Sequence, residues 1–142
     1  MHFVTGGAFN GKRRWVEAFY GYPHKSGGWH SFYESADVSK EVWDHGIVVL
    51  EGMEMFVKNT LNEVNEKGRE QLRLELKKWC EWEQSNGTRK LVLIGSDIGK
   101  GIVPIEKEHR LWRDMAGWFY QDIVSAAYRV DVIWYGLSER LK

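Results

Sequence analysis

FVTGGAFNGKRRWVEAFY, residues 3–20, carries seven of the eight positions of a phosphate-binding loop. A short apolar run leads to Gly6, the template G-x-x-x-x-G-K ends at Lys12, and a segment of helical pattern follows. Glycines in such a loop let successive backbone N–H groups turn inward around a phosphate, and the helix N-terminus adds a partial positive charge. We expect Lys12 to reach the outer phosphates. The predicted nucleotide-binding residues are Gly6, Gly7, Ala8, Phe9, Asn10, Gly11, Lys12 and Arg13.

The eighth position departs from the template, because Arg13 stands where Ser or Thr normally ligates the magnesium ion that bridges two phosphates. Arginine cannot ligate a metal. Its guanidinium either neutralises phosphate charge directly or points away to solvent, and the sequence leaves both open. The alternative to a nucleotide site is a strand–turn–helix junction whose glycines only permit a tight turn.

Four short runs rich in Val and Ile predict the strands of one sheet: residues 2–5, 46–50, 90–94 and 130–135. Each run is nearly continuous rather than alternating, which is typical of parallel strands covered on both faces.

Longer segments of helical period lie between these runs. Leu111, Met115, Phe119, Ile123 and Ala127 form an apolar stripe at four-residue spacing, which predicts an amphipathic helix within residues 105–128. Residues 53–84 also read as helical, with a break expected at Gly68, and residues 21–35 read as a loop. Alternating strands and helices predict an α/β layer architecture.

The bulk properties indicate one domain, residues 1–142, with 43% hydrophobic residues. Twenty Lys plus Arg balance twenty Asp plus Glu, so the chain lacks the basic field that nucleic acid or an anionic membrane attracts. The single cysteine, Cys80, suits a reducing cytosol and is expected to be inert on a helix. No apolar run is long enough to cross a bilayer. We therefore expect a cytoplasmic protein with small-molecule or protein partners.

Two acids stand at predicted strand ends, where ligands of open α/β sheets bind. Glu51 closes the run GIVVL, and Asp97 follows KLVLIGS. Carboxylates there can hold magnesium directly or through water, so Glu51 and Asp97 are the candidate Mg²⁺ residues. The alternative is that they cap the helices that follow.

The last third of the chain, IGSDIGKGIVPIEKEHRLWRDMAGWFYQDI followed by VDVIWYGLSERLK, resembles the bifunctional adenosylcobinamide kinase and adenosylcobinamide-phosphate guanylyltransferase family of cobalamin biosynthesis. VTGGAFNGKRR and VVLEGMEMFVKNTL are similar to two further segments of that family. The positions that match in the last third are Gly99, Gly101, Ile102, Val103, Pro104, Arg113, Asp114, Ala116, Gly117, Gln121, Gly136, Leu137, Leu141 and Lys142.

The resemblance implies a RecA-like P-loop NTPase fold, a three-layer sandwich around a mostly parallel sheet, and a homotrimer. It also implies two reactions: phosphorylation of adenosylcobinamide by GTP or ATP with Mg²⁺, then transfer of GMP from GTP onto adenosylcobinamide phosphate.

The resemblance also implies site residues. Lys12 and Glu51 would serve phosphoryl transfer, and His24, ahead of a Gly-Gly-Trp segment, is the best candidate for the histidine that carries GMP, with His30 second. Lys100 and Arg113 could add positive charge near phosphates.

The chain departs from the family at Arg13, at Gly95, Ser96 and Asp97, where the family has Ser, Asn and Glu, and in a shortened histidine segment. These departures motivate the alternative: a nucleotide- or corrinoid-binding homologue without turnover.

Overall fold

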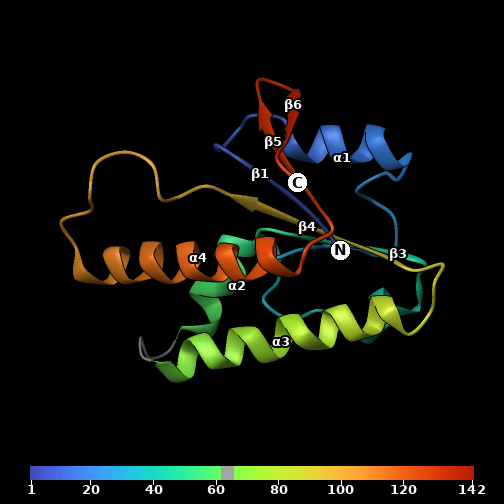
Figure 1. Ribbon diagram of the computed structural model, residues 1–142, viewed down its shortest axis with the longest axis horizontal. Coiled ribbons are helices and arrows are strands. Elements are labelled where there is room, and N and C mark those ends of the chain that lie inside the picture. The colour runs from blue at the N-terminus through green and yellow to red at the C-terminus, as the bar shows by residue number, and fades with distance from the viewer. Residues whose placement is uncertain (62–65) are drawn as a thin grey trace.

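The computed structural model describes residues 1–61 and 66–142, and its strands form one six-stranded sheet (Figure 1). The strand order is β2-β3-β4-β1-β5-β6; the first five strands are parallel, and β6 runs antiparallel to β5. The strands are β1 His2–Gly6, β2 Trp29–Ser31, β3 Ile47–Glu51, β4 Lys90–Ser96, β5 Arg129–Trp134 and β6 Leu137–Arg140.

Helices cover both faces of this sheet. Figure 1 shows α1 on one side and α2, α3 and α4 grouped on the other. The helices are α1 Lys12–Tyr20, the 3-10 helix η1 Lys40–Asp44, α2 Met53–Thr60, α3 Glu66–Gln84 and α4 Lys107–Ala126. The layered α/β fold with a mostly parallel sheet is thus confirmed. None of the helices described is long and apolar enough to span a membrane.

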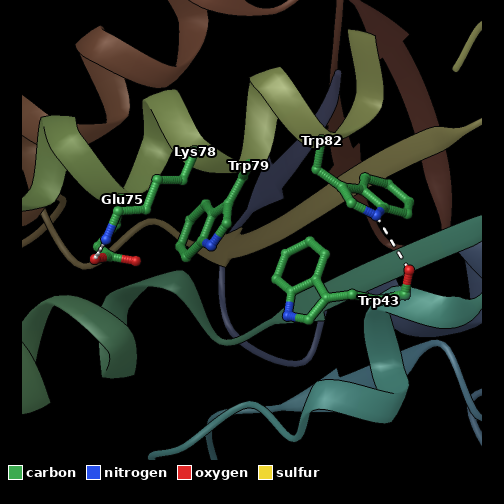
Figure 2. Close-up of a pocket in the computed structure, with 5 residues that line it drawn as sticks. All are labelled: Trp43, Glu75, Lys78, Trp79 and Trp82. Atoms are coloured by element: carbon green, nitrogen blue, oxygen red, sulfur yellow. Dashed lines mark hydrogen bonds and ion pairs between the residues drawn. The ribbon is translucent and has the colours of Figure 1, made fainter. Parts of the chain in front are cut away.

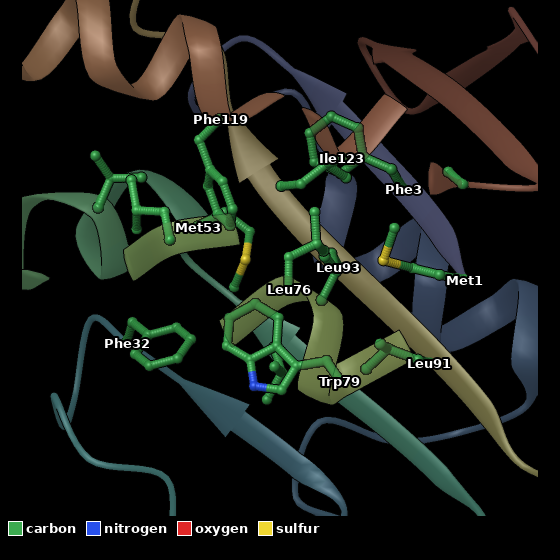
Figure 3. Close-up of a cluster of buried hydrophobic side chains, with 14 of the residues drawn as sticks. Met1, Phe3, Phe32, Met53, Leu76, Trp79, Leu91, Leu93, Phe119 and Ile123 are labelled. Atoms are coloured by element: carbon green, nitrogen blue, oxygen red, sulfur yellow. The ribbon is translucent and has the colours of Figure 1, made fainter. Parts of the chain in front are cut away.

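Alternate residues of the central strands supply two separate apolar cores, as the pleat requires. Leu91 and Leu93 of β4 point toward α2, α3 and α4, where they join Phe119 of α4 in the larger core (Figure 3). Val92, between them, faces α1 and packs with Val16 in the smaller core. These strands read as continuous apolar runs because both faces are buried.

The four predicted strands are confirmed, and their register is parallel. The predicted loop 21–35 is wrong in part, because Trp29–Ser31 forms β2 and pairs with β3. The predicted break at Gly68 is also wrong. Gly68 is buried inside α3, whereas α2 already ends at Thr60. On α4, Met115, Phe119 and Ile123 are buried as expected, while Leu111 is only half-buried.

The parallel strands place the candidate residues at one edge of the sheet. The carboxyl ends of β1, β3 and β4 lie side by side there, and the N–H of Asp97 donates to the Gly6 carbonyl at 2.9 Å. The glycine loop, Glu51 and Asp97 therefore share this edge, as the sequence predicts.

Candidate functional site

The glycine loop turns sharply between β1 and α1. Gly6 has φ 141°, Phe9 φ 61° and Gly11 φ 86°, so the chain reverses through left-handed positions before α1 begins at Lys12. A Cβ on Gly6 would lie 2.4 Å from the Ile133 carbonyl oxygen of β5, so only glycine fits there. The Asn10 carbonyl accepts the N–H of Gly136 at 2.9 Å, which anchors the loop on the turn between β5 and β6.

Lys12 lies inside this loop. Its side chain is buried, and Nζ donates to the Gly7 carbonyl at 2.7 Å. Burial lowers the pKa of the Lys12 ammonium, although the nearby charges of Glu54 and Glu51 raise it. A buried cation held by one carbonyl in a curled backbone loop is arranged to receive an anion.

Arg13 turns toward β3. Its Nε donates to both carboxylate oxygens of Glu51, at 2.9 and 3.0 Å, and its Nη2 lies 2.9 Å from Oε2. The indole Nε1 of Trp29 donates to the same Oε2 at 3.1 Å. The hydrogen bond to Glu51 raises the pKa of Arg13 above its ordinary value. Of the two possibilities open for Arg13, the second is wrong, because the guanidinium forms an ion pair with buried Glu51 instead of pointing away to solvent.

The residues at this edge do not fit a magnesium ion held by protein ligands. Arg13 replaces the hydroxyl, and both oxygens of Glu51 already accept N–H donors. Asp97 accepts the N–H of Gly99 at 2.9 Å and lies 3.5 Å from Lys100 Nζ. Over residues 1–61 and 66–142, no three His, Cys, Asp or Glu side chains are grouped to hold a metal. The assignment of Glu51 and Asp97 to Mg²⁺ stays a prediction.

The helix-cap alternative fails for both acids. Gly52 is the N-cap of α2, with no side-chain cap bond, so Glu51 does not cap that helix. No helix begins directly after Asp97, because α4 starts at Lys107. The Asp97 carboxylate instead closes a turn onto Gly99.

A further acid, Glu54, lies at this edge, although no sequence motif marks it. It is buried in the first turn of α2, where its Oε2 accepts the Ser96 N–H at 2.9 Å and the Tyr120 hydroxyl at 3.4 Å. Tyr33 also donates to its Oε1. The only signal in the sequence was an acid three residues after Glu51, where the next helix begins. Glu54 ties the end of β4, through Ser96, and the middle of α4, through Tyr120, to the edge that carries Lys12.

Trp29 lies between His24 and the Arg13–Glu51 pair and contacts both His24 and Glu51. The Nδ1 of His24 lies 2.6 Å from Glu17 Oε1, which also accepts the His24 backbone N–H at 2.7 Å, and these bonds lower the pKa of Glu17. The imidazole is 41% exposed and lies edge-on to Trp29, at 6.4 Å between ring centroids. Trp29 in turn binds Glu51, so contacts connect His24 to the glycine loop.

His30, the second candidate, is held differently. Its Nε2 lies 3.0 Å from the Ser35 carbonyl, its ring packs on Phe32, and burial lowers its pKa. An imidazole whose Nε2 is occupied is less suited to attack phosphorus than one whose Nδ1 is occupied and whose Nε2 is free.

Lys100 and Arg113, the two other candidate cations, make contacts that hold the segment after β4 in place. Lys100 lies 4.6 Å from the ring centroid of Trp134 and pairs with Asp97, and Arg113 of α4 donates to the Gly99 carbonyl. They fix residues 97–101 beside the glycine loop.

A pocket of about 260 Å³ lies at the other end of the sheet, where the strands begin. It is lined by Trp43, Glu75, Lys78, Trp79 and Trp82, and Figure 2 shows Trp43 of η1 pointing toward the tryptophans of α3. Both segments lead into the beginnings of strands, η1 into β3 and α3 into β4. The pocket is therefore remote from the glycine loop, and the Trp82 Nε1–Trp43 carbonyl bond of 3.1 Å serves to hold η1 on α3.

Comparison with known proteins adds the family. A family model for cobinamide kinase / cobinamide phosphate guanyltransferase matches residues 22–141, a range that includes Glu51, Asp97 and His24 but begins after the glycine loop. No curated protein matches the chain. The assignment of the glycine loop therefore rests on its geometry, while the family match covers most of the remaining chain. The chain thus belongs to the cobinamide kinase / cobinamide phosphate guanyltransferase family, which has the P-loop NTPase fold and serves cobamide biosynthesis.

Proposed function

We propose that this protein phosphorylates adenosylcobinamide, taking the γ-phosphoryl group from GTP or ATP. The observation that carries the proposal is the curled loop 6–11 with Lys12 buried at the start of α1, in a chain of this family. The loop amides and the N-terminus of α1 bind the phosphate chain, and Lys12 exchanges the Gly7 carbonyl for a phosphate oxygen.

Phosphoryl transfer requires positioning and charge neutralisation more than covalent work by the protein. The corrinoid hydroxyl oxygen forms a bond to the γ-phosphorus, the bond from that phosphorus to the β–γ bridging oxygen breaks, and nucleoside diphosphate leaves. The proton of the hydroxyl passes to solvent or to a carboxylate at this edge. Glu54 and Glu51 are the carboxylates whose charges act on Lys12.

The test uses purified protein, γ-labelled GTP or ATP and adenosylcobinamide, with labelled corrinoid as the readout. Lys12→Ala is expected to weaken nucleotide binding by about 10- to 100-fold, the loss of a hydrogen-bonded charge. Lys25→Ala, an exposed lysine outside the loop, is the matched control. Undiminished binding by Lys12→Ala would remove the loop from the site. Nucleotide binding without any labelled corrinoid would favour the homologue without turnover.

Guanylyl transfer is the second candidate function, favoured by the geometry of His24. Glu17 holds Nδ1 and orients the ring, which leaves Nε2 on an exposed imidazole. In this step Nε2 forms a bond to the α-phosphorus of GTP and pyrophosphate leaves. An oxygen of adenosylcobinamide phosphate then takes the GMP and frees the imidazole.

The intermediate can be trapped with α-labelled GTP as acid-labile label on the chain. His24→Ala is expected to abolish the label and Glu17→Gln to reduce it, because the ring loses its orienting charge. His30→Ala should retain it, since its Nε2 is occupied. Label that survives His24→Ala would assign the step to another residue.

A further inference from the structure

The loop carries a second fixed cation at the position where this fold normally uses a metal anchor. We infer that Arg13, held by Glu51, binds the nucleotide phosphates directly with its remaining N–H donors, in the role that a bridging magnesium ion would otherwise have. The inference rests on the proposed nucleotide site.

The residues around position 13 do not fit a magnesium ion. A hydroxyl is missing at position 13, and the guanidinium that replaces it repels a divalent cation. The nearest carboxylate, Glu51, is already neutralised by that guanidinium and also accepts the Trp29 N–H.

Arg13 has more N–H donors than its pair with Glu51 uses. A guanidinium has five N–H donors. Glu51 takes the Nε–H and one Nη2–H, and among the residues that the structure describes no partner is found for Nη1. The Arg13 side chain is 40% exposed, although Glu51 is buried. Three donors on a charged, planar group therefore remain for an anion.

Arg13 is also held in a fixed orientation beside the glycine loop. Arg13 follows Lys12 in the first turn of α1, so both cations leave the helix N-terminus that closes the glycine loop. The two-point ion pair with buried Glu51 fixes the Arg13 side chain before a ligand arrives. Less side-chain rotational freedom is then lost when the ligand binds. Glu51 is then a positioning residue, and Arg13 is the phosphate-binding residue.

The test is calorimetric titration of the full chain with GTP, and separately ATP, in buffer containing either EDTA or MgCl₂. The wild-type dissociation constant should change less than about threefold between the two buffers. Arg13→Ser removes the cation and restores the hydroxyl. It should lose roughly tenfold or more in EDTA and recover with magnesium. Arg14→Ser, an exposed arginine one residue later, is the matched control and should behave as wild type.

Glu51→Gln separates the two possible duties of Glu51. If Glu51 positions Arg13, the variant should bind nucleotide more weakly in both buffers by a similar factor. If Glu51 ligates magnesium, as the sequence predicts together with Asp97, the loss should occur only with magnesium. A wild-type affinity that falls tenfold or more in EDTA would overturn the inference while leaving the proposed function intact. Folded wild type that binds no nucleotide in either buffer would overturn both.

Discussion

At the scale of single residues, the ion pair between Arg13 of α1 and Glu51 of β3 determines the charge beside the glycine loop. Glu51 and Lys12 stand out from their positions at a strand end and in a motif, and the structure brings them to one edge. The pairing of Arg13 with Glu51 spans 38 residues of chain, and no local pattern encodes it. Glu54 escapes sequence reasoning for the same reason, because its partners come from β4, α4 and the segment after β2.

His2 is a buried polar residue that lies outside the glycine-loop motif. Its ring is fully buried, with Nε2 2.7 Å from Asp131 Oδ2 and Nδ1 2.6 Å from the Tyr20 hydroxyl. A neutral imidazole satisfies both contacts, donating to the carboxylate and accepting from the phenol. Burial lowers the pKa of His2, against the opposing effect of Asp131, while Arg129 lowers it further.

The lowered pKa predicts a pH dependence of stability. In the unfolded chain His2 takes up a proton as the pH falls below about 6.5, whereas the folded protein holds the imidazole neutral. The stabilisation is therefore fully present above that pH and is lost below it, by at most about 1.4 kcal/mol per pH unit. Chemical unfolding at pH 7.5 and 5.5 should show a larger loss for wild type than for His2→Gln. Equal losses would contradict the assignment, whatever the absolute stability of the variant.

At the scale of elements, the hydrophobic pattern of the sequence predicts the buried strands and helices. It does not predict elements that carry no such pattern. The central strands are apolar on both faces, so they stand out. β6 is exposed along its whole length, and β2 has only three residues, so neither carries a periodic signal. Gly68 lies within α3 because tertiary packing outweighs the low helix propensity of one glycine.

Replacing glycine by alanine should have opposite effects on stability at two positions of the chain. Gly117 lies on the exposed face of α4, and a Cβ added to it would meet no neighbouring atom within 4 Å, so Gly117→Ala should stabilise the protein by about 0.5–1 kcal/mol. Gly11 has φ 86°, so Gly11→Ala should destabilise it by about 1–2 kcal/mol, although its Cβ would meet Gly136 at an ordinary 3.4 Å. Urea unfolding measures both. A neutral Gly11→Ala would mean that the loop does not need its left-handed turn.

At the scale of the whole molecule, exposed apolar side chains lie on the three segments that follow β1, β4 and β5 at the carboxyl end of the parallel strands. We name the apolar edge by its exposed members: Phe9, Ile102, Ile105, Tyr135 and Leu137. They come from three segments that the Asn10–Gly136 bond and the Lys100–Trp134 contact hold together. Exposed apolar side chains clustered on one side of a domain are typical of a surface that another molecule covers.

We propose that the apolar edge is covered by a second copy of the chain, in the homotrimer that the family resemblance implies. Sedimentation equilibrium should give three times the chain mass of 16.6 kDa. The double substitution Ile102→Asp and Ile105→Asp should shift the protein toward monomer, because charges at a packed interface lose their hydration. Leu74→Asp, an exposed residue of α3, is the control and should remain trimeric. A wild-type monomer would exclude the trimer and leave the apolar edge to the corrinoid, in which case the double variant should weaken adenosylcobinamide binding.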